Sequence, residues 1–239
     1  MRSVPAARSS GPFPLVIFGH GFAVMPDLYK RLLRAWTRAG YVVAAPVFPL
    51  ENENAPGGPD ESDLINQPAD MSYVISALLS ATNARSGPLR GLIDPARIAV
   101  TGQSDGGDTA LALAYNSSFR DRRVSAVIAL AGAEMPGVGG YSFPRGTPPL
   151  LAVQGTADTI NPPRLTDAFF GAAQRPKFRL NLPGSEHLPP YSDQQPQLAI
   201  VQGVTTAFLD HYLKQDPRAL KRLAAWGNFS GKAALIAEP

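Results

Sequence analysis

The pentapeptide Gly102-Gln103-Ser104-Asp105-Gly106 constrains this chain most, because it follows the apolar run RIAVT and precedes a segment with helical periodicity. A strand that turns sharply into a helix presents the central serine at the carboxyl edge of a sheet. Such a turn strains the backbone of the serine, so its neighbours must be small. The pattern therefore predicts Ser104 as a nucleophile at the end of a strand.

Short apolar runs alternate with amphipathic segments along the chain, as in an α/β protein with a parallel sheet. The predicted strands are 15–19, 41–48, 97–102, 124–132, 149–155 and 177–182. Helices are predicted around 28–36, 71–79, 106–115, 162–173, 198–214 and 218–226. The stretch 51–68 is rich in Pro, Gly and Asn and is expected to be a long loop, and the residues after 226 are expected to fray.

Length and composition narrow the class of protein. A chain of 239 residues suits one domain over 1–239, with a flexible N-terminal segment (1–12) and a C-terminal extension (215–239). The absence of cysteine excludes disulfides, thiolate nucleophiles and Cys-based metal sites. The net charge of +3 is spread over many segments, which argues against nucleic-acid binding. No apolar segment is long enough to span a membrane. The sequence is compatible with either a cytoplasmic or a secreted protein.

A serine nucleophile needs a base, and the chain has three histidines with which to supply it. In hydrolases with this turn, the triad members follow the chain order serine, acid, histidine. His20 precedes Ser104, and His211 lies inside a predicted helix. His187 lies in a loop directly after the last predicted strand, so it is the predicted base.

The acid that orients the base is expected between Ser104 and His187, again after a strand. Asp158 follows the run PLLAVQG and is favoured. Glu134 is the alternative, but it leads into a stretch rich in Gly and Pro, and Asp167 lies inside a predicted helix.

The reaction also needs donors for a developing oxyanion. The backbone N–H of Asp105 is one candidate, and the N–H of Phe22 in the turn Gly19–Phe22 is the other. The Asp105 carboxylate is expected to turn away from the substrate, because a negative charge there would oppose the oxyanion. The candidate pocket residues are Phe22, Met25, Gln103, Ile160 and Leu188.

Four segments occur in one order: FPLVIFGHGF, IDPARIAVTGQSDGG, GTADTINPP and PGSEHLPPY. Over about residues 13–213 the chain thereby resembles the α/β-hydrolase superfamily, and in particular its lidless esterases, which include dienelactone hydrolases, chlorophyllases and cutinase-like polyesterases. The resemblance implies an α/β-hydrolase fold, with a mostly parallel sheet flanked by helices. It implies Ser104, Asp158 and His187 as the triad, Phe22 and Asp105 as oxyanion donors, and no metal or organic cofactor.

Three departures from those relatives bear on the fold and the site. Too few residues precede Leu15 for the usual N-terminal strand hairpin, so the strand 41–48 is expected at a sheet edge. An exposed apolar edge favours pairing, so we expect this edge to pair with a second copy in a homodimer or to be covered by the N- or C-terminal segment. The alternative is that the chain is truncated relative to its relatives. Residue 103 is Gln where the relatives more often have His or Trp, and their C-terminal disulfide is impossible here.

A cap domain is not expected either, because only 18 residues separate Ala131 from Leu150. The site should therefore be open, with a rim formed by the stretches 51–68 and 137–149 and by the loop around His187.

The expected function is hydrolysis of small-molecule or polymeric carboxylic esters through an acyl-enzyme on Ser104. The sequence does not distinguish a simple ester from a cutin-type polyester, a lactone or an amide as the substrate. A catalytically silent ligand-binding fold is the alternative of another class. A dinucleotide site is disfavoured because GHGFAV lacks the third glycine of G-x-G-x-x-G.

Overall fold

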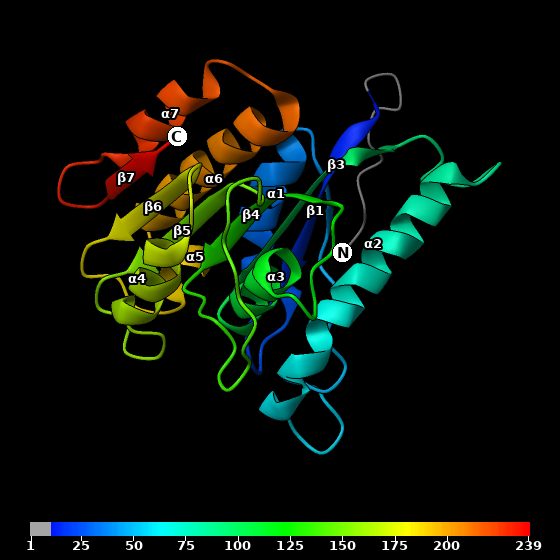
Figure 1. Ribbon diagram of the computed structural model, residues 1–239, viewed down its shortest axis with the longest axis horizontal. Coiled ribbons are helices and arrows are strands. Elements are labelled where there is room, and N and C mark those ends of the chain that lie inside the picture. The colour runs from blue at the N-terminus through cyan, green and yellow to red at the C-terminus, as the bar shows by residue number, and fades with distance from the viewer. Residues whose placement is uncertain (1–10) are drawn as a thin grey trace.

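The structure is a computed structural model that describes residues 11–239. Its centre is a seven-stranded sheet in the order β2-β1-β3-β4-β5-β6-β7 (Figure 1). Strands β1 to β6 run parallel, and β7 pairs antiparallel with β6. Helices cover both faces, so the predicted α/β class is confirmed.

The strands are β1 (Phe13–Gly19), β2 (Val42–Ala44), β3 (Ile93–Gln103), β4 (Val124–Leu130), β5 (Leu150–Gly155), β6 (Lys177–Leu182) and β7 (Ala234–Glu238). The α-helices are α1 (Lys30–Arg38), α2 (Gln67–Asn83), α3 (Asp105–Tyr115), α4 (Pro163–Ala172), α5 (Pro189–Ser192), α6 (Gln197–Lys214) and α7 (Ala219–Gly227). Two 3-10 helices, η2 (Pro26–Tyr29) and η3 (Glu61–Asn66), precede α1 and α2.

The sheet separates two hydrophobic cores, because alternate residues of a strand point to opposite faces. Val16 and Phe18 of β1 lie in the core shared with α1 and α6. Leu15 and Ile17 lie in the core shared with α2, α3 and α4. All four residues are fully buried, and each contributes about 1.5–3 kcal/mol by leaving water. This two-sided burial explains why β1 is a continuous apolar run.

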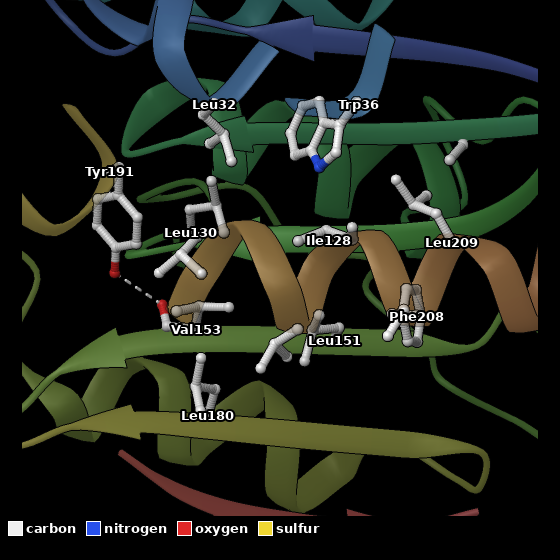
Figure 2. Packing of buried hydrophobic residues seen from close by; sticks show 14 of the residues in the cluster. Leu32, Trp36, Ile128, Leu130, Leu151, Val153, Leu180, Tyr191, Phe208 and Leu209 are labelled. Carbon is white, nitrogen blue, oxygen red and sulfur yellow. Dashed lines mark hydrogen bonds between the residues drawn. The ribbon is translucent and has the colours of Figure 1, made fainter. Parts of the chain in front are cut away.

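Figure 2 shows the core beneath α6, where Ile128, Leu151 and Phe208 pack between the helix and the sheet. The hydroxyl of Tyr191 donates to the carbonyl oxygen of Val153 at 3.1 Å. Tyr191 belongs to α5, which follows the loop of His187. This hydrogen bond therefore fastens that loop to β5.

The edge strand β2 is shorter than predicted, with Val42–Ala44 in place of 41–48. After Ala44 the chain leaves the sheet, and the N–H of Phe48 donates to His20 Nε2 at 3.0 Å rather than to a strand. Within residues 11–239 no strand lies outside β2, in agreement with the expected lack of an N-terminal hairpin. Pairing of this edge with a second copy stays a prediction.

The C-terminal segment departs from the prediction in part. Helix α7 forms where it was expected and packs on α6, where the Trp226 ring lies against Gly203. The residues after α7 do not fray. They form β7, which pairs with β6 at the sheet edge opposite β2. The expected cover of β2 by the C-terminal segment is therefore wrong, and an N-terminal cover by residues 1–10 lies outside the described residues.

No cap domain interrupts the fold within the described residues. The segment 131–149 between β4 and β5 contains turns and one isolated bridge, Tyr141 to Asn116. None of the helices in residues 11–239 is long and apolar enough to cross a bilayer. The carboxyl ends of β1, β3, β5 and β6 are thus left open at one edge of the sheet.

Candidate active site

Ser104 occupies the turn between β3 and α3. Its backbone has φ 55° and ψ −126°, a strained combination for a residue with a side chain. The N–H of Ser104 donates to the carbonyl oxygen of Leu130 in β4 at 3.0 Å, which ties the turn to the neighbouring strand. The predicted strand–turn–helix is therefore present.

Glycines make this turn possible by allowing backbone segments to approach closely. A Cβ atom on Gly106 would collide with the carbonyl group of Gly19 at the end of β1. A Cβ atom on Gly102 would collide with the backbone of Gly106. The first turn of α3 thereby lies directly against the loop after β1.

His187 lies in the loop after β6, and its ring connects Ser104 to Asp158. Nε2 of His187 is 2.9 Å from Ser104 Oγ, and Nδ1 is 2.8 Å from Asp158 Oδ2. These three residues lie far apart in the sequence, so the fold brings them together. The arrangement has the geometry of a nucleophile, a base and an orienting acid.

The carboxylate of Asp158 is buried but well supplied with donors. Its Oδ1 accepts hydrogen bonds from the N–H groups of Ile160 at 3.0 Å and Asn161 at 2.9 Å. Gln154 Nε2 donates to Oδ2 at 3.1 Å. These hydrogen bonds fix the carboxyl group with Oδ2 facing Nδ1 of His187.

The other candidate acids lie elsewhere. Glu134 is exposed and has no contact with His187, and Asp167 forms an ion pair with Arg179. His211 lies in α6, where its ring packs against Tyr212. None of these residues lines the cavity at Ser104.

His20 is fully buried, and its ring forms hydrogen bonds to the backbone. The N–H of Phe48 donates to His20 Nε2, so Nε2 carries no proton and the proton lies on Nδ1. Nδ1 donates to the carbonyl oxygen of Gly21 at 2.8 Å. Burial lowers the pKa of His20 below its usual value, which keeps the ring neutral. The neutral ring fixes the turn after β1.

The two predicted oxyanion donors are adjacent to Ser104 and unpaired. Within residues 11–239, neither the N–H of Phe22 nor the N–H of Asp105 has a hydrogen-bond acceptor. Ala23 has φ 55°, and its N–H donates to the carbonyl oxygen of Glu51 at 2.8 Å. The backbone of Glu51 thus holds the turn that carries Phe22. Asp105 supplies its N–H at the N-terminus of α3, where the helix dipole favours negative charge.

A chain of polar side chains that the sequence analysis missed links this turn to the histidine loop. The Tyr29 hydroxyl accepts a hydrogen bond from the N–H of Gly21 at 3.4 Å and donates to Gln103 Oε1 at 2.7 Å. Gln103 Nε2 donates to the carbonyl oxygen of His187 at 3.1 Å. Gln103 therefore holds the backbone of His187 in place as well as lining the pocket. Its hydrogen-bond partners lie 74 and 84 residues away in the sequence, so no local sequence pattern predicts these contacts.

A cavity of about 670 Å³ opens at Ser104. Of the predicted pocket residues, Phe22, Gln103, Ile160 and Leu188 line it. Met25 does not, because the chain turns at Ala23 and presents Val24 in its place. The stretch 137–149 does not form part of the rim either, since its Tyr141 pairs with Asn116 beyond the C-terminal end of α3.

The expectation for the Asp105 side chain is wrong. Asp105 lines the cavity, and its Oδ1 lies 3.5 Å from Ser104 Oγ. Burial raises the pKa of Asp105 above its usual range, and the charge of Glu61 adds to this effect. The carboxyl of the fully buried Glu51 faces Asp105. Burial, followed by the charge of Asp105, raises the pKa of Glu51 to about 8.

The class of protein follows from this fold and geometry. A mostly parallel sheet with a serine on the turn after β3 defines an α/β-hydrolase fold. The family model for Chlorophyllase matches residues 3–161, and the chain belongs to this family of α/β-hydrolases. Family membership indicates an ester hydrolase. The search of curated proteins found no match to this sequence.

The match covers Ser104 and Asp158 but ends before His187. The place of His187 in the site therefore rests on the two ring contacts described above.

Proposed function

We propose that this protein hydrolyses carboxylic esters through an acyl-enzyme on Ser104, with His187 as the base and Asp158 as the orienting acid. The observation that carries the proposal is the continuous series of two hydrogen bonds, 2.9 Å from Ser104 to His187 and 2.8 Å from His187 to Asp158. The series ends in an open cavity, where an ester carbonyl can reach the serine oxygen.

In the first half of the reaction, Ser104 Oγ attacks the ester carbonyl while His187 Nε2 takes the hydroxyl proton. The negative charge that develops on the carbonyl oxygen is stabilised by the N–H groups of Phe22 and Asp105. The ester C–O bond then breaks, and His187 returns the proton to the leaving alcohol. The acyl group is left on Ser104.

In the second half, a water molecule attacks the acyl carbon while His187 takes one of its protons. The same two N–H groups stabilise the second oxyanion. The bond to Ser104 Oγ breaks, His187 gives the proton back to the serine, and the carboxylic acid leaves. Asp158 keeps the imidazole in the tautomer with its proton on Nδ1 and stabilises the imidazolium that forms in each half.

The cavity at Ser104 is not covered by a cap domain within the described residues, and part of its lining is apolar. Phe22 and Leu188 form apolar walls, and Ile160 is 68% exposed at the rim. This opening favours esters whose acyl or alcohol part extends into solvent. A polymeric ester would meet the same requirement, and the substrate panel below tests it.

The test is hydrolysis of p-nitrophenyl esters, from acetate to a long acyl chain, by the parent and by Ser104→Ala. We expect the variant to lose roughly a million-fold in kcat, since removal of the nucleophile of a serine triad has an effect of this order. Ser80→Ala is the matched control, because Ser80 is exposed on α2, and it should keep the parent rate. A folded parent with no turnover would favour the ligand-binding alternative, and equal turnover by Ser104→Ala would exclude this nucleophile.

The acid side of the pH profile tests the base. Protonation of His187 removes its ability to accept the serine proton, so the rate should fall on acidification. A rate that does not depend on pH on the acid side would contradict the role of an imidazole base.

A further inference from the structure

Two buried carboxyl groups next to Ser104 are not explained by the triad. Glu51 is fully buried, and Asp105 is 7% exposed. Glu51 Oε1 and Asp105 Oδ2 receive no hydrogen bond from any N–H or hydroxyl group of residues 11–239. Two ionised carboxylates cannot satisfy each other, whereas a carboxylic acid and a carboxylate can share one proton.

The remaining contacts of Glu51 define the orientation of its carboxyl group. Gln67 Nε2 donates to Glu51 Oε2, and Gln67 Oε1 accepts a hydrogen bond from Thr109 Oγ1 at 2.7 Å. Gln67 is thus fixed as a donor towards Oε2. The proton on Glu51 is left to Oε1, on the side of Asp105.

Glu51 also touches both halves of the proposed oxyanion site. Its carbonyl oxygen accepts the N–H of Ala23, the residue after Phe22. Its side chain meets Asp105, whose N–H is the other proposed donor. One residue therefore connects the loop after β1 to the first turn of α3.

We propose that Glu51 and Asp105 share one proton, and that this bridge is a positioning device that holds the two oxyanion donors at a fixed separation. The inference rests on the proposed function. Glu51 touches no substrate in this proposal and acts through Asp105 and Ala23. Loss of the proton places two negative charges side by side next to the oxyanion, which pushes the two segments apart.

The surroundings of the pair strengthen this conclusion. Burial and the charge of Asp105 hold the pKa of Glu51 near 8, so the proton is present at neutral pH. The charge of His187 lowers the pKa of Asp105, but burial and the charge of Glu61 raise it by more. The titratable groups that face the pair are Glu61 and Asp63 of η3, Asp108 of α3, Tyr29 of η2 and His187.

The decisive variant is Glu51→Gln, because an amide reproduces the protonated acid. Its oxygen can accept from Gln67, and its NH₂ group can donate to Asp105, but it has no proton to lose. We measure kcat and KM for p-nitrophenyl acetate from pH 6 to pH 10, corrected for spontaneous hydrolysis. The parent should lose roughly tenfold in kcat above about pH 8, with little change in KM.

Glu51→Gln should keep most of the parent kcat at pH 7 and should lack the alkaline fall. Glu51→Ala should have a roughly tenfold lower kcat at all pH values, with KM nearly unchanged. Glu53→Gln is the matched control, since Glu53 is exposed in the same loop, and its profile should equal that of the parent. A parent without an alkaline fall, or an equal fall in Glu51→Gln, would overturn the proposal.

A second measurement does not depend on activity. In the parent labelled with ¹³C at the glutamate side-chain carboxyl carbons, one NMR resonance should titrate with a midpoint near pH 8. This resonance should be missing in Glu51→Gln and present in Ser104→Ala. If every glutamate titrates near its ordinary pKa, no proton is shared and the inference is wrong. If Ser104→Ala keeps the parent activity, the proposed function fails, while the NMR result still decides on the carboxyl pair.

Discussion

At the scale of single residues, hydrogen bonds fix the buried carboxyl group of Asp158 beside His187. The N–H groups of Ile160 and Asn161 donate to Oδ1, while Oδ2 accepts from the amide of Gln154 and also faces His187. The position of Asp158 therefore does not depend on His187 alone.

Asp158→Asn is expected to lower kcat by roughly 10³ to 10⁴ with the fold intact, because an amide can stabilise the wrong tautomer of His187. Steady-state kinetics with p-nitrophenyl acetate, together with circular dichroism, measure both effects. Glu134→Gln changes the alternative acid in the same way and should leave kcat unaltered. A severe loss in Glu134→Gln, or none in Asp158→Asn, would assign the acid differently.

The sequence predicts some of these residues much better than others. Ser104, Asp158 and His187 each follow a recognisable strand, and the chain order of a hydrolase triad selects them among the other polar residues. Glu51 and Gln103 could not be predicted in the same way. Their roles depend on partners in other elements, and nothing in their local sequence distinguishes a buried carboxyl or amide from an exposed one.

At the scale of elements, the close approach of α3 to the loop after β1 determines where Ser104 lies. Gly106 has no room for a Cβ atom beside Gly19. The first turn of the helix therefore approaches the sheet at the cavity lined by Phe22 and Asp105, the two proposed oxyanion donors.

Gly106→Ala should lower the free energy of unfolding by about 3 kcal/mol, since the added methyl group meets rigid backbone. For a domain of this size, that corresponds to a fall in Tm of roughly 6–12 °C. Gly171→Ala is the matched variant, because Gly171 is an exposed residue of α4 with no atom within 4 Å of the new Cβ. It should raise the stability by about 0.5–1 kcal/mol. Thermal unfolding of both variants measures the contrast, and similar shifts in the two would refute the close approach.

The elements themselves were largely predictable, and the sheet edges were not. The periodicity of α2, α3, α4, α6 and α7 was sufficient to locate them within a few residues. The end of β2 was missed because the chain leaves the sheet to meet a buried histidine, a contact across 28 residues. Strand β7 was missed because five residues with only modest burial carry a weak alternating pattern.

At the scale of the whole molecule, the carboxyl pair makes stability depend on pH. The folded state raises the pKa of Glu51 from 4.5 to about 8, so between these values the folded protein binds more protons than the unfolded chain. The free energy of unfolding should therefore decrease as the pH rises through this window. Below pH 4.5 both states are protonated at this site and the loss is absent.

Urea unfolding of the parent and Glu51→Gln at pH 5, 7 and 9 measures this effect. The parent should lose stability towards pH 9 more steeply than Glu51→Gln, because the amide removes one of the linked protons. Glu53→Gln should follow the parent. Parallel pH dependences for the parent and Glu51→Gln would mean that Glu51 carries an ordinary pKa.

The pairing of β7 with β6 has a consequence for the order in which a newly synthesised chain becomes active. Ser104 and Asp158 are translated well before His187, and His187 is translated well before residues 234–238. Until those residues have left the ribosome, β6 is paired with β5 alone. The loop that carries His187 then follows a strand at the edge of the sheet. The segment that carries Ser104 is thus translated early, whereas the sheet edge beside the loop of His187 is completed late, when residues 234–238 pair with β6.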